Sequence, residues 1–92
     1  MKIVKLNRRF KQFKDAGHTV ALRFNGWNTD VPKVETICRE RLGGRSYDNR
    51  NSWYGYFGSL ARGNTYRPYW ISFRNESDLT LVLLSVNLTQ ND

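Results

Sequence analysis

Arginines and aromatic rings alternate between Leu42 and Arg74, and these are the residues of the chain whose types and spacing could do chemistry. The stretch reads LGGRSYDNRNSWYGYFGSLARGNTYRPYWISFR and holds five arginines among tyrosines, tryptophans and phenylalanines, with Asp48 as its single acid. Arginine carries a permanent charge on a planar group that pairs with phosphate and stacks on rings. Tyr and Trp offer flat apolar faces with a polar tip. Two interpretations stay open: a surface that binds nucleic acid, or ordinary aromatic strands joined by basic turns.

The net charge of +7 is concentrated in two blocks. Residues 1–23 hold seven basic residues against Asp15, a balance of +6, and residues 41–74 hold six arginines against Asp48, a balance of +5. Residues 75–92 carry −3. Such a basic excess attracts polyanions and speeds their capture, but it does not distinguish RNA or DNA from an anionic membrane or an acidic protein. The first block mixes lysine with arginine, whereas the second uses arginine alone.

The length of 92 residues predicts a single domain over 1–92 with a small core. Cys38 is the only cysteine, so no intramolecular disulfide can form and a reducing compartment is expected. The longest apolar segment, Leu79 to Val86, is too short to span a bilayer, and no signal-type apolar run follows the basic N-terminus. We therefore expect a soluble, cytoplasmic protein with no membrane partner.

The first 17 residues fit two patterns. In one, Ile3, Leu6, Phe10 and Phe13 form the apolar stripe of a single helix. In the other, which we favour, residues 2–6 form a strand, Asn7 caps a helix over residues 8–16, and Gly17 ends it. In both, the phenylalanines pack inward and the basic residues face water.

The next two elements are better specified. Residues 18–24, HTVALRF, alternate as a half-buried strand does. Thr29 or Asp30 then caps a helix that has Pro32 in its first turn and ends at the two glycines 43 and 44. Its apolar stripe is Val34, Ile37, Cys38 and Leu42.

The C-terminal half predicts strands separated by loops. Residues 44–52 are a loop by composition. Residues 53–60 form a strand in which Gly55 and Gly58 allow close backbone approach. Residues 68–74 form another, with Tyr69, Ile71 and Phe73 on one face and Trp70, Ser72 and Arg74 on the other. Residues 79–86 fit a last strand and also a helical template, so their type stays open, and residues 87–92 are expected to be a frayed tail.

Together these elements predict an α+β fold: a mainly antiparallel sheet with one or two helices packed on one face. The expected order is a strand or helix, then strand, helix and three strands. The uncovered face of the sheet would then carry the aromatic residues that do not pack under the helices.

The chain lacks the residue sets that catalysis or metal binding needs. A Cys–His nucleophile pair would require His18 and Cys38 in reach of each other, but Cys38 lies on an apolar helix stripe and is expected to be a buried small hydrophobe. One histidine and one cysteine make no zinc site, and no glycine-rich phosphate loop is present. We expect a non-enzymatic protein with no cofactor and no metal.

The leading hypothesis is a non-catalytic nucleic-acid-binding protein that prefers RNA or single strands, because exposed rings and loop arginines suit unstacked bases. The N-terminal cations would contact phosphates, the loop arginines would contact phosphates or stack, and the rings would stack on bases. The predicted binding residues are Lys5, Arg8, Arg9, Lys11, Lys14, Arg45, Arg50, Trp53, Tyr54, Tyr56, Arg62, Tyr66 and Arg67.

A second hypothesis uses the same residues differently. Tyr, Trp and Arg are also favoured at protein interface hot spots, so the chain could be a small phage-type accessory or inhibitor protein that binds an acidic surface of a host protein. A third is a homo-oligomer formed through an open sheet edge.

Overall fold

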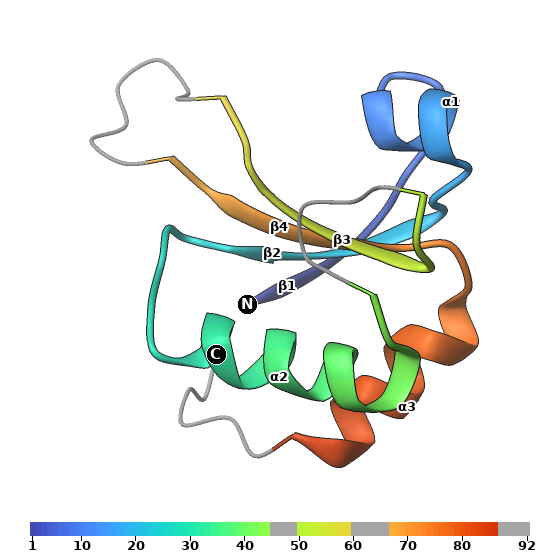
Figure 1. Cartoon of the computed structure of the whole chain (residues 1–92). Helices are drawn as coiled ribbons and strands as arrows, with labels where there is room; N and C mark the ends of the chain where they lie inside the picture. Colours follow the sequence, from blue (N-terminus) through green and yellow to red (C-terminus); the bar gives the residue numbers. More distant parts are fainter. Residues whose placement is uncertain (45–49, 60–66, 87–92) are drawn as a thin grey trace.

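In a computed structural model of the chain, the structure describes residues 1–44, 50–59 and 67–86. Figure 1 shows a twisted sheet with α2 and α3 on one side and α1 on the other. The described elements, in chain order, are β1 (Lys2–Lys5), α1 (Lys11–Ala16), β2 (Val20–Phe24), α2 (Asp30–Leu42), β3 (Trp53–Phe57), β4 (Tyr69–Phe73) and α3 (Glu76–Ser85).

The four strands form one sheet in the order β1-β2-β4-β3, and every neighbouring pair is antiparallel. β4 is inserted between β2 and β3, which are therefore parallel to each other and are joined through α2. The predicted α+β fold, an antiparallel sheet with helices packed on one face, is confirmed. α1 is the exception, since it lies on the opposite side (Figure 1).

The core lies between the sheet and the helices α2 and α3. The strands contribute large side chains at alternate positions, and β4 shows the predicted pattern, with Tyr69, Ile71 and Phe73 buried on the core face. From the helices, Val34 and Cys38 of α2 and Leu79 and Val82 of α3 complete the same cluster. Burial of such side chains contributes roughly 1.5–3 kcal/mol each, so this face provides most of the stability of the domain.

The N-terminal segment follows the strand-then-helix pattern, with one correction. β1 is a strand, but α1 begins at Lys11 and not at Arg8. Asn7 accepts the backbone N–H of Arg9 through its Oδ1 at 2.9 Å, and Phe10 keeps an extended backbone. This local turn competes with helix formation for the donors near residue 8. Gly17 ends α1 as predicted, in the left-handed region at φ 72°.

α2 matches its prediction closely, except at its cap. It spans Asp30–Leu42, and Gly43 ends it with φ 74°. Thr29 stands at the N-cap without a side-chain cap bond. Instead, Oδ1 of Asn28 accepts the backbone N–H of Asp30 at 2.9 Å, so the capping oxygen comes from one residue earlier than expected.

The segment whose type stayed open, 79–86, is helical up to Ser85 and extended at Val86, so the expected order that ends in three strands is wrong. α3 starts at Glu76, and its Thr80 and Ser85 hydroxyls donate to backbone carbonyls one turn earlier. The reason is tertiary, because Leu79 and Val82 pack on the core cluster beside α2. The predicted tail at residues 87–92 lies outside the described residues.

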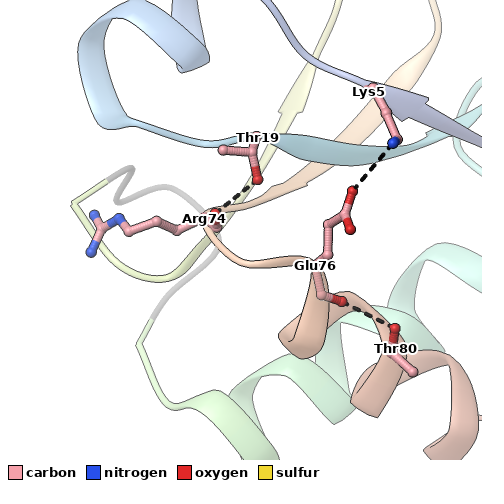
Figure 2. A network of polar contacts seen from close by, with 5 residues as sticks. All are labelled: Lys5, Thr19, Arg74, Glu76 and Thr80. Carbon is pink, nitrogen blue, oxygen red and sulfur yellow. Dashed lines mark hydrogen bonds and ion pairs between the residues drawn. The ribbon is translucent and has the colours of Figure 1, made fainter.

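A small polar network joins α3 to the sheet. As Figure 2 shows, Lys5 on β1 lies 3.8 Å from a carboxylate oxygen of Glu76, and the hydroxyl of Thr19 donates to the carbonyl of Arg74 at 2.9 Å. The Lys5 and Glu76 side chains are largely exposed, so their ion pair contributes little to stability. The Thr19 bond extends the pairing of β2 with β4 beyond their last ladder pair.

Candidate functional site

The face of the sheet turned away from α2 and α3, hereafter the ring face, carries a row of aromatic side chains. Tyr54 and Tyr56 project from β3, and Trp70 lies opposite Tyr56 on β4. The two tyrosine rings are 5.2 Å apart between centroids with planes 21° apart, and Tyr56 and Trp70 are 6.5 Å apart with planes only 5° apart. The three rings therefore share nearly one orientation, which lets a flat ligand extend the row.

A guanidinium group stands at the other end of this row. Arg23 on β2 is paired with Trp70 on β4, and its Cζ lies 5.9 Å from the centre of the Trp70 ring. Its Nη1 also donates to the side chain of Asn25 at 3.2 Å. A cation in this position is attracted by the π-electrons of the Trp70 indole. The row thus runs from Tyr54 through Tyr56 and Trp70 to Arg23, with planar groups from three strands.

A buried polar contact fixes the sheet beside the row. His18 and Ser72 are both fully buried, and Nδ1 of the imidazole lies 2.6 Å from the serine hydroxyl oxygen. Nε2 lies 3.1 Å from the carbonyl of Asn51. Because a carbonyl only accepts, Nε2 carries a proton and donates it to the Asn51 carbonyl. His18 therefore links the segment before β3 to the centre of the sheet, next to Tyr54.

The rings of the row are only half-exposed, and burial changes the acidity of Tyr56. The pKa of Tyr56 is raised to about 12, mainly by burial and also by the neighbouring Tyr54, while a hydrogen bond with Ser72 opposes the shift. Tyr56 is therefore neutral at physiological pH. A neutral phenol adds no negative charge to a surface whose surrounding side chains are basic.

A cleft of about 370 Å³ opens between the start of α1 and the ends of β3 and β4. Phe10 forms one wall and meets the edge of Trp70, with centroids 5.8 Å apart and planes at 62°. Tyr56 and Trp70 form the sheet side, and Arg9 and Lys11 line the cleft as exposed cations. The cleft therefore combines flat apolar walls with two positive charges.

The N-terminal cations divide between the two sides of the sheet. Arg8, Arg9, Lys11 and Lys14 are exposed on the turn and helix on the ring-face side. Lys5 is paired with Val20, whose side chain is buried in the core, so Lys5 belongs to the core side and reaches Glu76. Lys5 is thus separated from the other predicted phosphate contacts.

The prediction that Trp53 stacks on a ligand is wrong. Trp53 is 0% exposed in the core, and its Nε1 donates to the carbonyl of Gly43 at 2.6 Å. The reason is strand parity, since Trp53 pairs with Phe73 on the core face and its neighbour Tyr54 points to the ring face. Tyr54 and Tyr56 do lie on the ring face, as a stacking role requires.

The loop arginines are only partly placed. Arg50 is exposed, and its carbonyl accepts Nη2 of Arg74 at 2.9 Å. Arg67 is exposed just before Pro68, whose carbonyl accepts the backbone N–H of Gly58. Arg45, Arg62 and Tyr66 lie outside the described residues, so their predicted roles stay predictions.

Three members of the site were not predicted as binding residues: Phe10, which was expected to pack inward, Trp70 and Arg23. Trp70 and Arg23 were each assigned to the strand face opposite the core residues, but neither was named as a binding residue. The sequence did carry a signal for both, because the alternation along each strand places them on the face opposite the core. What the sequence lacked was the strand order, which sets Arg23 directly beside Trp70.

Cys38 and His18, which were considered as a nucleophile pair, have different surroundings. Cys38 is buried as predicted, and burial together with the charge of Glu35 raises its pKa to about 12. His18 faces Ser72 and Asn51 and not the thiol. Among the described residues, no three His, Cys, Asp or Glu side chains come close enough to hold a metal ion. None of the described helices is both long and apolar enough to cross a membrane.

Comparison with known proteins found no match to this chain among family models, curated proteins or solved structures.

Proposed function

We propose that the protein binds nucleic acid without catalysing a reaction, with RNA or other single strands as the preferred ligand. The observation that carries the proposal is the row of Tyr54, Tyr56 and Trp70 on the ring face, with the cations of the α1 segment beside it. Such rings stack on bases of any sequence, and each contributes roughly 1–3 kcal/mol to binding. The lone buried thiol of Cys38 fits a reducing, cytoplasmic location.

The charges around the row support the same ligand. Among the described residues, Arg9 and Lys11 form no ion pair, so both remain available to phosphate oxygens. Arg23 can act as a planar cation beside Trp70. An acidic protein partner would also meet these charges, but it has no general need for a series of parallel rings. Unpaired bases do, because their flat faces are exposed.

The rings can be tested with one ring from each side of the sheet. Tyr56→Ala removes a ring from the ring face, whereas Trp27→Ala removes a 54% exposed ring that packs against Tyr69 of the core face. With a fluorescein-labelled single-stranded RNA decamer, we expect Tyr56→Ala to weaken binding by about 5- to 150-fold, the equivalent of one stacked base. Trp27→Ala should bind nearly as the unchanged protein does. Equal loss in both variants would contradict the proposal.

The phosphate contacts can be tested with a pair of arginines. Arg9 lies in the cleft and Arg39 is exposed on α2, on the other side of the sheet. Arg9→Ala should make the negative slope of log affinity against log salt shallower by about 0.7, the value for one phosphate contact with a single strand. Arg39→Ala should leave the slope unchanged. If the unchanged protein ignores RNA and DNA decamers at low salt, the proposed function is wrong and an acidic protein partner becomes the better hypothesis.

A further inference from the structure

The geometry points to a more specific role for the cleft between α1 and the sheet: it receives one unpaired base, and Arg9 and Lys11 hold the phosphate next to it. This inference rests on the proposed function and adds to it a defined subsite. The ring row by itself would let a flat ligand extend its stack. The cleft, which shares Tyr56 and Trp70 with the row, adds a defined place for a single base.

The walls of the cleft offer apolar ring surface to a nucleobase. Phe10 approaches from the α1 side and meets the edge of Trp70, and Tyr56 stands on the sheet side, so a base can lie against Phe10 and Tyr56. The volume of about 370 Å³ lies within the range of pockets that enclose small ligands. A base that is paired and stacked in a duplex cannot enter such a cleft, because both of its faces and its pairing edge are occupied.

The packing of Trp70 at the floor of the cleft requires a glycine. A Cβ built on Gly58 would lie 2.5 Å from Nε1 and 2.9 Å from Cδ1 of Trp70, and 3.1 Å from Cγ of Pro68. Only the missing side chain lets the indole of Trp70 lie against this backbone. Gly58→Ala therefore displaces the ring that forms the sheet side of the cleft, without removing any ring or any charge.

The cations lie where the phosphate of an inserted base needs them. Arg9 and Lys11 flank Phe10 in the sequence, and both line the cleft while being exposed to solvent. A base held against Phe10 and Tyr56 would bring its backbone to these side chains. Charge-assisted hydrogen bonds to phosphate are the contacts that Arg and Lys make best.

The test combines protein variants with a modified ligand. A labelled hexamer of single-stranded RNA is compared with six versions that each carry one abasic nucleotide, which keeps the phosphate and removes the base. With the unchanged protein, we expect one abasic position to weaken binding by about tenfold or more, the equivalent of one lost stacked base. Gly58→Ala should weaken binding of the intact hexamer to a similar degree and should show no further loss at that position.

This non-additivity is the signature of the subsite, because two changes that remove the same contact are coupled. Lys11→Ala is the matched control: it should weaken the intact and the abasic hexamers alike, since it removes a phosphate contact only. Phe10→Leu gives a second test of the wall that does not rely on Gly58→Ala, and it should also be coupled to the abasic position. Thermal unfolding establishes that each variant is folded.

The outcomes separate the two proposals. If the intact hexamer binds but every abasic position costs the same, or if the effects of Gly58→Ala and Phe10→Leu add to that of the abasic nucleotide, the subsite does not exist and the ring row alone binds. If no hexamer binds the unchanged protein at low salt, the proposed function itself is overturned, and the subsite with it.

Discussion

The two faces of β3 and β4 carry the same types of residue, but these residues differ in burial and in what they contact. On the core face, Trp53 and Tyr69 are buried and hydrogen-bonded, to the Gly43 carbonyl and the Glu35 carboxylate respectively. On the ring face, Tyr54, Tyr56 and Trp70 are half-exposed and lie parallel to one another. A tryptophan or tyrosine is therefore not a binding residue by its type. Its position in the strand alternation decides whether it is buried in the core or left accessible to a ligand.

The largest expected effect compares one tryptophan from each face. Trp53→Ala should lower the free energy of unfolding by about 3–5 kcal/mol, because it opens a cavity in the core, and it also removes the bond to Gly43. Trp70→Ala should cost clearly less in stability and more in RNA affinity. Urea unfolding followed by circular dichroism measures the first quantity, and fluorescence anisotropy with a labelled decamer measures the second. A larger loss of unfolding free energy for Trp70→Ala than for Trp53→Ala would contradict the difference between the two faces.

A smaller effect separates the tyrosine hydroxyls of the two faces. The hydroxyl of Tyr69 donates to Oε2 of Glu35 at 2.6 Å, and both residues are buried. Tyr69→Phe leaves this carboxylate without that donor and should cost about 1–3 kcal/mol in unfolding free energy. Tyr54→Phe on the ring face should change stability by less than about 0.5 kcal/mol. Similar values in urea unfolding would show that the two faces do not differ in this way.

The smallest effect concerns pH. Burial raises the pKa of the Cys38 thiol from 9.0 to about 12 and that of Tyr56 from 10.0 to about 12. In the unfolded chain these groups lose their protons at lower pH than in the folded protein. Stability should therefore be unaffected by these groups below about pH 9 and should decline as pH rises from 9 towards 12.

As pH rises, Cys38 should lower the stability before Tyr56 does, because the ordinary pKa of the thiol is lower, 9.0 against 10.0. Urea midpoints measured at pH 7, 9 and 10 should fall over the last step, and the fall should be smaller in Cys38→Ala relative to its own value at pH 7. A midpoint that stays constant to pH 10 in the unchanged protein would contradict the assignment of Cys38 as a buried thiol.

Local patterns predicted most of the fold, and they left the type of one segment open for a tertiary reason. The strand at 18–24, the helix ending at Gly43 and the face assignment of Tyr69, Ile71 and Phe73 all follow from periodicity and terminal residues, which act over a few neighbours. The type of residues 79–86 could not be settled this way, because Leu79 and Val82 suit either template. Their packing beside α2 decides it.

The residue types of the candidate site were predicted from the sequence, but only some of its individual residues were. Tyr54, Tyr56 and the cations of residues 8–14 were named correctly as surface residues, whereas Trp53 was assigned to the wrong face. Both faces of that strand are aromatic, so alternation alone cannot tell which one the helices cover. Trp70 and Arg23 join the site only through the pairing of β2 with β4.

The amino-acid sequence by itself determined the charge, the single thiol, the supply of rings and the alternation that separates neighbouring side chains, because these depend on residue type and local geometry. Only the tertiary structure decided which face is covered, since that depends on where α2 and α3 pack. It also placed Phe10, Tyr56 and Trp70 around one cleft, bringing together residues up to 60 positions apart in the chain. Contacts at such separation follow from the strand order, which no local pattern encodes.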